Sequence, residues 1–500
     1  MAPLAYARLE ERFRQLDSLG GAEAVLHWDL ATMMPPGGAS ARADQLAAVK
    51  AVRHDLITRS DVADWLADAA DDATLGPWQR ANLKEMTRQH AHATALSPAQ
   101  VDALSRATSV CEAAWREARA ADDFATVLPS LDALLTRVRE TALAKAERLG
   151  LSPYDALLDS YEPGGRCADI DRIFGDLVVV LDDVLPRVLE RQARDAPVPE
   201  FTGPFPFEKQ RRLAVRLMET LGFDFRHGRL DISLHPFCGG TPDDVRITTR
   251  YDETDFQSAL MGVLHETGHA LYERGLPAAW RGQPVGEARG MAMHESQSLL
   301  MEMQVCRSRE FFTFAAPLLA ETLTNGADAD ERWSADALFR HYTRVTPGLI
   351  RVDADEVTYP FHVILRYDLE RAMIAGDLKP ADLPGAWNDA IKRHLGIRPP
   401  GDRLGCLQDI HWYDGAWGYF PTYTLGALAA AQLFAAAVRD RPDIPEAVSQ
   451  GQFQPLLDWL RTHVHGQASL SSGNEVLIAA TGAPLGVSAF ADHLRRRYLA

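Results

Sequence analysis

The chain contains little cysteine, and the cysteine it has is scattered. There are five cysteines in 500 residues, an odd number, and none of them forms a Cys-x-x-Cys pair. This spacing argues against a disulfide framework and against a zinc site built from thiolates. A reducing compartment fits such a sequence best, so we expect a cytoplasmic protein.

Long apolar runs and an excess of positive charge are also missing. The longest apolar run, residues 425–438, contains Gln432 and is too short to cross a bilayer, so it predicts a buried helix. The charged start of the chain lacks the apolar segment of a secretory signal. A formal net charge of −17 at pH 7 opposes nucleic-acid binding, which needs a basic surface. We therefore expect a protein that binds neither membranes nor nucleic acids.

Hydrophobic periodicity predicts a mainly α-helical protein. A hydrophobic content of 46% can build a large core, and apolar residues recur at helical spacing along most of the chain. No composition break marks a boundary, so we expect one domain, residues 1–500, built as a continuous helical body with subdomains. We expect the first helix to span residues 4–19 and to end at the glycine pair 20–21. The basic cluster 495–497 is expected to be a solvated helix terminus.

Two histidines stand four positions apart in an apolar helical stretch, with a glutamate between them, as His265-Glu266-x-x-His269. At about 3.6 residues per turn both imidazoles lie on one face and can converge on a metal ion, while Glu266 reaches the attacking water. Tetrahedral zinc then needs a third protein ligand, and Glu295 downstream offers one. The alternative is a core helix with satisfied histidines. Two histidines and a glutamate in register favour a zinc site of His265, His269 and Glu295.

Two short segments just before this helix alternate apolar and polar residues. They are residues 230–234 and 245–250, separated by a glycine-rich stretch at 238–242. The pattern predicts a small antiparallel β-sheet beside the metal helix. An edge strand beside a metal can hold an extended peptide by main-chain pairing, so this ribbon is either a substrate shelf or an ordinary structural hairpin.

Several separate strings make the chain resemble the thermostable carboxypeptidase (carboxypeptidase Taq) family, peptidase family M32. They are His-Pro-Phe at 235–237, Asp-Val-Arg-Ile-Thr at 244–248, His-Glu-Thr-Gly-His at 265–269, His-Glu-Ser at 294–296, Ile-Arg-Val-Asp-Ala-Asp at 350–355 and Gly-Cys-Leu-Gln-Asp-Ile-His-Trp at 405–412. Weaker likenesses, such as Tyr-Glu-Pro-Gly at 161–164, extend the resemblance over nearly the whole chain.

The resemblance implies a largely α-helical fold like that of neurolysin and angiotensin-converting enzyme, with a deep cleft between two halves, and a homodimer. It places the metal site within residues 230–425. It implies a metallocarboxypeptidase of broad specificity that releases single C-terminal amino acids from peptides and acts poorly on C-terminal proline. His265, His269 and Glu295 would bind zinc, for which cobalt can substitute, and Glu266 would be the catalytic base.

The resemblance also points to residues that bind the substrate. Arg351 is suited to hold the free carboxylate of a peptide in bidentate fashion. A surface salt bridge with Asp353 or Asp355 is the alternative. Arg246 and His235 are further candidates for substrate binding, and the string that contains His235 would close off the cleft.

Three polar side chains are candidates to stabilise the oxyanion that forms during attack: Tyr423, Tyr419 and His411. Each could equally serve packing alone. His294, beside Glu295, could orient that carboxylate, or it could be an ordinary core or surface histidine.

Two other classes of function stay open. An endo-acting zinc oligopeptidase of the neurolysin type would keep the metal site but would accept peptides with blocked C-termini. A helical binding protein without activity would show no turnover, although the intact Glu266 argues against it.

Overall fold

The computed structural model describes residues 2–195, 197–198, 200–324 and 330–500, and these residues form twenty α-helices and one small sheet. The helices before the sheet are α1 (Ala2–Thr32), α2 (Ala39–Thr58), α3 (Ser60–Ala70), α4 (Pro77–Thr94), α5 (Pro98–Ala121), α6 (Phe124–Leu149), α7 (Pro153–Leu158), α8 (Cys167–Gln192) and α9 (Phe207–Thr220). Those after it are α10 (Phe256–Gly275), α11 (Gly290–Leu299), α12 (Arg309–Thr324), α13 (Ala335–Tyr342), α14 (Tyr359–Ala375), α15 (Leu383–Leu395), α16 (Pro421–Asp440), α17 (Ile444–Ser449), α18 (Gln454–His463), α19 (Gly473–Thr481) and α20 (Ser488–Leu499). The expected mainly α-helical class is confirmed.

The glycine pair does not end the first helix. Helix α1 continues through Gly20 and Gly21 to Thr32, so the expected end at this pair is wrong. A Cβ atom on Gly21 would lie 3.1 Å from Thr241 Cγ2, and one on Gly20 would lie 3.4 Å from Arg53 Nη2. The two glycines therefore allow α1 to pack closely on its neighbours, and this tertiary contact outweighs their poor helix propensity.

The sheet is mixed, with the strand order β1-β3-β2. Strand β1 (Gly228–Ile232) pairs parallel with β3 (Asp244–Thr249), and β2 (Phe237–Thr241) pairs antiparallel with β3. A purely antiparallel sheet was expected, and the parallel pair corrects that expectation. The glycine-rich stretch at 238–242, expected as the connection, instead forms most of β2, so the chain reverses direction twice between β1 and β3 and these two strands run parallel. On the inner face, Val245 and Ile247 pack against Val263 and Ala270 of α10.

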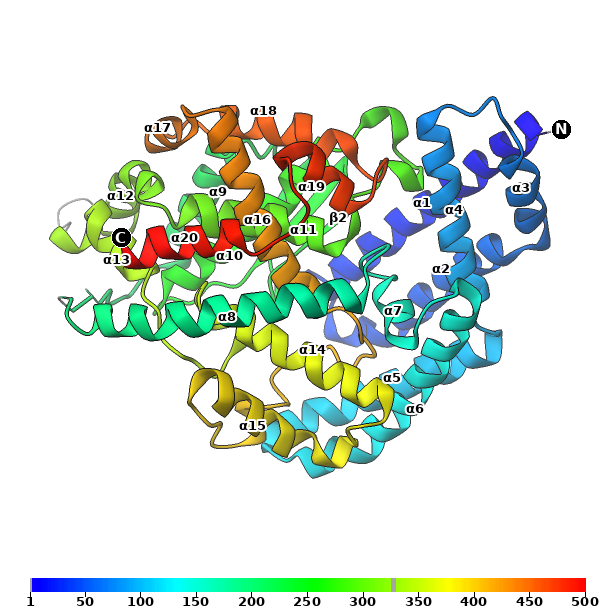
Figure 1. The fold of residues 1–500 in the computed structure, drawn as a ribbon, viewed down its shortest axis with the longest axis horizontal. Helices are drawn as coiled ribbons and strands as arrows, with labels where there is room; N and C mark the ends of the chain where they lie inside the picture. The colour runs from blue at the N-terminus through cyan, green and yellow to red at the C-terminus, as the bar shows by residue number, and fades with distance from the viewer. Residues whose placement is uncertain (1, 196, 199, 325–329) are drawn as a thin grey trace.

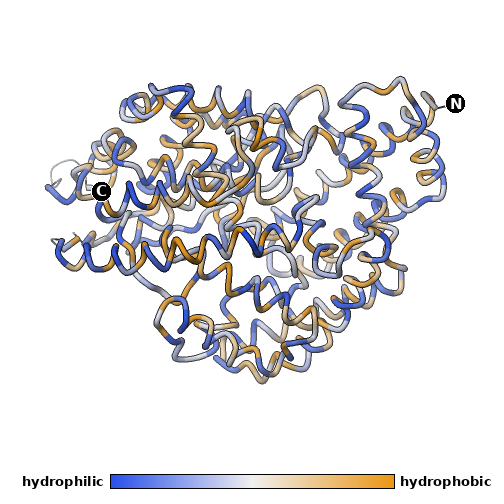
Figure 2. Tube along the Cα trace, viewed as in Figure 1, coloured by the Kyte–Doolittle hydropathy of each residue, from blue (hydrophilic) through white to orange (hydrophobic). Residues whose placement is uncertain are grey.

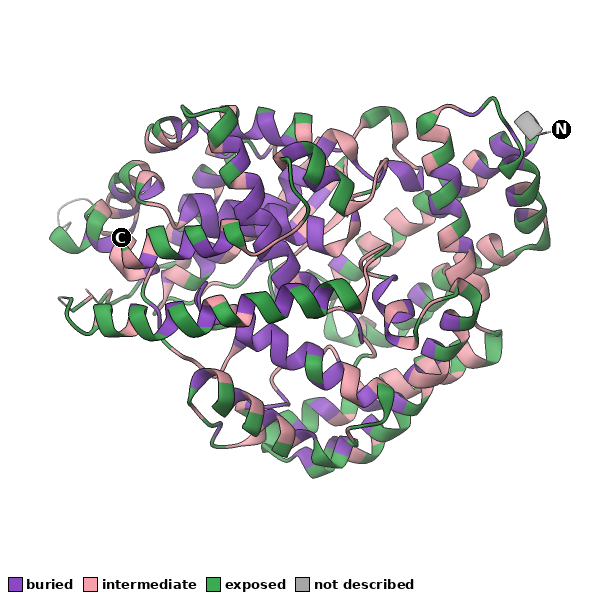
Figure 3. Ribbon diagram, viewed as in Figure 1, coloured by how far each residue is buried: buried purple, intermediate pink, exposed green. Residues whose placement is uncertain are grey.

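Burial is greatest around three helices at the centre of the molecule. Figure 3 shows the buried residues concentrated in α10, α11 and α16, and the same helices lie inside a shell of other helices in Figure 1. Helix α8 belongs to that shell and alternates apolar and polar residues along its length (Figure 2), as an amphipathic surface helix does. The sheet and α10 lie together, which positions the sheet beside the predicted metal helix.

Helix α16 contains the long apolar run. It is 20 residues long, so it exceeds the 14-residue run at 425–438, and among the described residues it is the one helix that could cross a membrane by length and composition. However, 72% of its apolar window is buried inside the protein. Gln432 donates hydrogen bonds to Thr481 and to the carbonyl oxygen of Ala483. These contacts confirm the expected buried helix.

The arginine cluster at the end of α20 is only partly solvated. Arg495 and Arg496 are exposed, but the side chain of Arg497 is 8% exposed and lies 3.0 Å from Glu356. The expectation of a solvated terminus is therefore wrong for Arg497. Its charge is compensated by a buried carboxylate that lies far away in the sequence.

Replacement of Gly268 is expected to destabilise the protein, because a Cβ atom there would lie 2.5 Å from the backbone oxygen of Gln297. We expect Gly268→Ala to lower the free energy of unfolding by about 1–3 kcal/mol. The control is Gly175→Ala on exposed α8, where a Cβ atom meets nothing within 4 Å and should stabilise by about 0.5–1 kcal/mol. Denaturant titration measures both. Equal effects of the two substitutions would contradict the close approach of α10 and α11.

Candidate metal centre

Helix α10 carries His265, Glu266 and His269. It begins after Asp255, whose side chain accepts a hydrogen bond of 2.8 Å from the backbone N–H of Gln257. The rings of His265 and His269 lie one helical turn apart, with their centroids separated by 5.0 Å. Glu266 and His269 are buried, and His265 is partly exposed. The helix thus presents both imidazoles on the same side.

Helix α11 brings Glu295 to these histidines. The Oε2 atom of Glu295 lies 3.4 Å from His269 Nε2 and 3.9 Å from His265 Nε2. The ligand atoms of the three residues all lie within 4.8 Å of one another. Ligand atoms of a tetrahedral zinc ion, each about 2.0–2.2 Å from the metal, are about 3.3 Å apart. The three side chains therefore fit one divalent ion in both spacing and donor chemistry.

Hydrogen bonds at Nδ1 decide which nitrogen of each histidine faces the candidate metal position. His265 Nδ1 lies 2.9 Å from Glu302 Oε2, and His269 Nδ1 lies 3.1 Å from the carbonyl oxygen of His294. Each Nδ1–H donates to its oxygen, which leaves both Nε2 atoms directed at Glu295 for metal binding. This pattern is how proteins orient histidine ligands.

Glu302 is not among the residues predicted from the sequence. This residue lies in a π-helical segment, Leu300–Cys306, that continues α11, and its other oxygen accepts a hydrogen bond of 2.6 Å from Arg307. Glu302 follows Glu295 by about two helical turns, so both carboxylates lie on one side of the same helix. That spacing is the signal that could have identified Glu302, although the wider π-helical turn alters the exact register.

His294 acts on the site through its backbone. Its Nε2 atom lies 2.8 Å from Glu273 Oε1, and its ring packs on His269 with centroids 4.5 Å apart. The structure pairs the side chain of His294 with Glu273 rather than with Glu295, because adjacent helical residues point about 100° apart. The carbonyl oxygen of His294 orients His269 instead.

The surrounding charges control the protonation of the site. Burial opposes a charge on His265, but Glu295 and Glu302 outweigh it and raise the pKa of His265 to about 10. Burial lowers the pKa of His269 to about 4. Burial alone would raise the pKa of Glu295, but the neighbouring histidines lower it to about 2. Burial raises the pKa of Glu266 to about 7. In the metal-free protein a proton on His265 therefore compensates the carboxylates.

Arg351 lies in a 3-10 turn, Arg351–Asp353, and is 5% exposed. Its Nε and Nη2 atoms both donate to Asp409, with Nη2 at 2.8 Å from Oδ1. Its Nη1 atom lies 3.4 Å from Tyr359 Oη, and the guanidinium stacks on the ring of Tyr423 at 4.7 Å. The arginine is thus held in a fixed orientation among aromatic side chains.

Asp409 is shared by two arginines. Arg366 is fully buried, and its Nη2 atom lies 2.6 Å from Asp409 Oδ2. The alternative of a surface bridge between Arg351 and Asp353 or Asp355 is therefore wrong, since the partner is buried and comes from a distant segment. Asp355 instead accepts hydrogen bonds from the backbone N–H groups of residues 357 and 358.

The three candidate oxyanion donors lie together. His411 Nε2 is 3.2 Å from Tyr423 Oη, and the rings of Tyr419 and Tyr423 have centroids 5.2 Å apart. Burial lowers the pKa of His411 to about 4 and raises the pKa of Tyr423 to about 12. After burial, the charge of Glu295 also contributes to the raised pKa of Tyr419 and Tyr423. At neutral pH both tyrosines therefore keep their protons near Glu295 and can donate them in hydrogen bonds.

Arg246 and His235 belong to the sheet region. Arg246 on β3 donates to Asp244 at 2.6 Å, and its guanidinium lies 4.5 Å from the ring of Trp28 on α1. His235 lies in the exposed turn between β1 and β2, where its carbonyl oxygen accepts a hydrogen bond from Ser233. These contacts tie Arg246 to the sheet and to α1 rather than to the candidate metal group.

Metal binding is expected to release a proton. At pH 8 His265 is protonated in the metal-free protein, because its pKa is raised to about 10, while Glu266 is largely ionised. A histidine must be neutral to bind a metal, so zinc binding at pH 8 should release about one proton and should tighten as the pH rises towards 10. Titration calorimetry in buffers of different ionisation enthalpy measures this number. Stoichiometric binding without proton release would contradict the charge assignment of His265.

Comparisons with known proteins identify the family of this chain. A sequence model described as Carboxypeptidase Taq (M32) metallopeptidase matches residues 8–498. Thermostable carboxypeptidase 1 of Thermus thermophilus is 37% identical over 99% of this chain and 98% of its own, and carboxypeptidase 1 of Bacillus subtilis is 33% identical over 97% and 96%. Among solved structures, metallocarboxypeptidase 1 of Trypanosoma cruzi superposes with a TM-score of 0.96 at 39% identity, covering 99% of both chains. The M32 carboxypeptidase of Deinococcus radiodurans gives 0.93 at 35% identity, also over 99% of both. This chain therefore belongs to the Carboxypeptidase Taq (M32) family of metallopeptidases.

Proposed function

We propose that this protein is a zinc metallocarboxypeptidase that removes single residues from the free C-terminus of peptides, with broad specificity and poor action on C-terminal proline. The metal group His265, His269 and Glu295 supports a metallopeptidase. The exopeptidase assignment rests on one further observation, which is the buried positive cluster around Arg351.

That cluster contains more positive than negative charge. Arg351 and Arg366 share the single carboxylate of Asp409, and all three side chains are buried or nearly so. Burial lowers the pKa of Arg366, but only to about 10, so both arginines stay charged at neutral pH. Glu370 is a further buried carboxylate that interacts with Arg366, but burial raises its pKa to about 7, so it is only partly ionised at neutral pH. A buried cluster whose positive charge is not fully compensated is costly unless an anion joins it. The terminal carboxylate of a peptide is an anion of the required charge and shape.

The cluster is linked to the metal group through two tyrosines. Tyr359 and Tyr423 both contact Arg351, and burial together with the charge of Glu295 raises the pKa of each. A carboxylate held by Arg351 would therefore place the last peptide bond near Glu295. The Nη1 atom of Arg351, whose contact with Tyr359 is as long as 3.4 Å, is the donor we assign to the substrate.

The remaining residues have roles that follow from their protonation. A bound zinc ion, or cobalt in its place, would polarise the scissile carbonyl and make a water molecule more acidic. Glu266, with a pKa raised by burial to about 7, takes the proton of the attacking water and passes it to the leaving amine. Tyr423, Tyr419 or His411 donates a hydrogen bond to the carbonyl oxygen as negative charge develops there.

Several broader features belong to the same proposal and rest on the family relationship. We propose a cytoplasmic homodimer whose chain is one catalytic domain with two helical subdomains, separated by a cleft like that of neurolysin and angiotensin-converting enzyme. Arg246 and His235 would then lie on the sheet side of that cleft. The proposed substrates are peptides, and no nucleic acid or membrane takes part.

The proposed reaction is tested with a matched pair of peptides that differ only in a free or amidated C-terminus. The zinc-loaded enzyme should shorten the free acid by one residue at a time, as read by mass spectrometry, and should leave the amide largely intact. Glu266→Gln should keep zinc and lose about 10²–10⁴-fold in kcat, since an amide cannot accept the proton. Internal cleavage of the amidated peptide would instead favour an oligopeptidase of the neurolysin type, and a near wild-type rate in Glu266→Gln would remove Glu266 as the base.

Substitution of Arg351 tests the carboxylate anchor. Arg351→Ala should lower kcat/KM on the free acid by about 10²-fold, the loss of a charge-assisted pair of about 3 kcal/mol, and should shrink the preference for acid over amide. The matched control is Arg226→Ala, which removes an exposed arginine paired with Asp224 and should leave both quantities unchanged. Unchanged kinetics in Arg351→Ala with intact folding and zinc content would overturn the assignment. The same loss in Arg246→Ala would move the anchor there.

A further inference from the structure

The segment Tyr161–Gly164 closes the N-terminal end of the helix that carries Glu295. The backbone N–H of Met291 donates to the carbonyl oxygen of Tyr161 at 2.8 Å, and the N–H of Ala292 donates to Glu162 Oε2 at 2.8 Å. Both N–H groups belong to the first turn of α11, where a helix has no partners of its own for them. A distant segment therefore supplies the cap that the residues before α11 do not supply.

Glycines leave room for this carboxylate. Gly290, the first residue of α11, has a φ angle of +63°, and a Cβ atom there would lie 2.7 Å from Glu162 Oε2. A Cβ atom on Gly165 would lie 3.1 Å from Glu162 Cγ, and one on Gly473 would lie 3.4 Å from Glu162 Oε1. Side chains at these positions would crowd the side chain of Glu162. The three glycines therefore provide the space that its carboxylate occupies.

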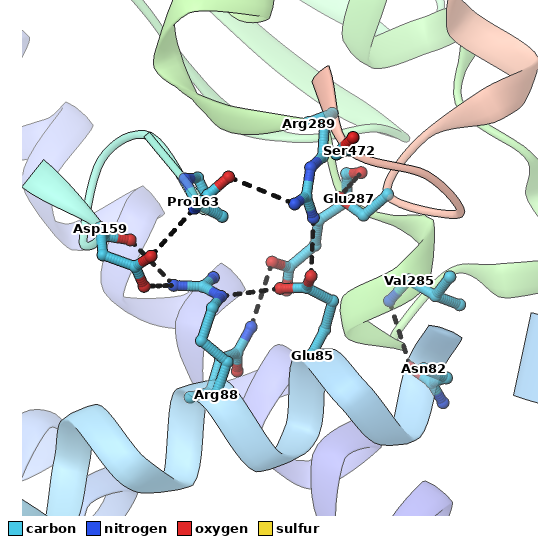
Figure 4. A network of polar contacts seen from close by, with 12 residues as sticks. Asn82, Glu85, Arg88, Asp159, Pro163, Val285, Glu287, Arg289 and Ser472 are labelled. Atoms are coloured by element: carbon cyan, nitrogen blue, oxygen red, sulfur yellow. Dashed lines mark hydrogen bonds and ion pairs between the residues drawn. The ribbon is translucent and has the colours of Figure 1, made fainter. Parts of the chain in front are cut away.

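A buried ionic network holds the segment in place (Figure 4). Arg289, the residue just before α11, donates to the carbonyl oxygen of Pro163 at 3.4 Å and pairs with Glu85 of α4 at 2.6 Å. Asp159 accepts a hydrogen bond of 2.9 Å from the backbone N–H of Gly164. Arg88 of α4 pairs with Glu85 at 2.8 Å and donates to the carbonyl oxygen of Asp159 at 3.1 Å. Helix α4 therefore fixes both the cap and the start of α11.

The same end of α11 also contacts α10, and the capping segment contacts Tyr419. The backbone N–H of Arg289 donates to Tyr272 Oη at 3.0 Å, and Tyr272 lies on α10 about one turn after His269. The ring of Tyr161 packs edge-on against Tyr419, with centroids 5.1 Å apart. The position of the first turn of α11 is thus coupled to α10 and to a candidate oxyanion donor.

We propose that Glu162 is a positioning residue for the metal ligand Glu295. Glu295 lies about one turn beyond the capped N–H groups, so fraying of the first turn of α11 would change its distance from His265 and His269. The carboxylate of Glu162 prevents this by holding the N–H of Ala292. The inference depends on the proposed metal site and adds to it a residue that touches neither the metal nor the substrate.

The test is the zinc affinity of the folded protein, measured by competition with a chelator at pH 8. This pH lies above the pKa of about 7 to which burial raises Glu162, so the carboxylate is ionised. Glu162→Ala should weaken zinc binding by about 10-fold or more, the effect typical of residues that support a metal ligand. Glu162→Gln should stay within about threefold of the wild type, because its amide oxygen still accepts from Ala292. If Glu162→Ala does not fold, Glu162→Asp, which cannot reach the N–H, carries the same expectation.

The matched control is Asp123→Ala. Asp123 caps α6 by accepting a hydrogen bond of 3.0 Å from the N–H of Ala125, and α6 carries no metal ligand. This variant should lose thermal stability through the lost cap but bind zinc as the wild type does. Wild-type zinc affinity in Glu162→Ala, with a fall in melting temperature like that of Asp123→Ala, would show that Glu162 is only structural and would overturn the proposal. Failure of the wild-type protein to bind zinc would instead overturn the proposed function.

Discussion

The metal group depends on how closely α11 packs between α10 and α16. A Cβ atom on Gly268 of α10 would lie 2.5 Å from the oxygen of Gln297, and one on Gly426 of α16 would lie 2.8 Å from Glu295 Cβ. Backbones approach this closely only where glycine removes the intervening side chain. Because helices are rigid over such short lengths, these two contacts fix Glu295 relative to His269. Caps, ionic networks and the π-helical turn then adjust an arrangement that the packing has already defined.

Two neighbouring clusters carry opposite charge imbalances. Around His265 and His269 the carboxylates are in excess, so a proton on His265 takes the place of a divalent cation in the metal-free protein. Around Asp409 the guanidinium groups of Arg351 and Arg366 are in excess. Buried charge is stable only when it is compensated. The proposed metal and the proposed peptide carboxylate would each supply the compensation that one cluster lacks, which connects the energetics of the fold to its function.

The sequence by itself determined the features that local periodicity controls. The helical repeat places His265 and His269 on one face, because residues four apart are neighbours on any α-helix. Apolar spacing at three and four predicted a mainly helical protein, and the alternating segments before α10 predicted strands. Ser152 and Pro153 mark the start of α7 through a local cap, with Ser152 accepting from the N–H of Asp155. All of these depend on interactions within a few residues of the chain.

Only the tertiary structure decided which distant groups meet. Glu302 supports His265 across a π-helical turn, Asp409 pairs with Arg351 from 58 residues away, and Glu162 caps a helix that begins far downstream. The same holds for the glycine pair in α1, where packing outweighed propensity, and for the parallel pairing of β1 with β3. A single sequence shows that a buried charge or an uncapped helix needs a partner. It does not show which one, because many residues satisfy the chemistry and only the packed chain brings one of them within reach.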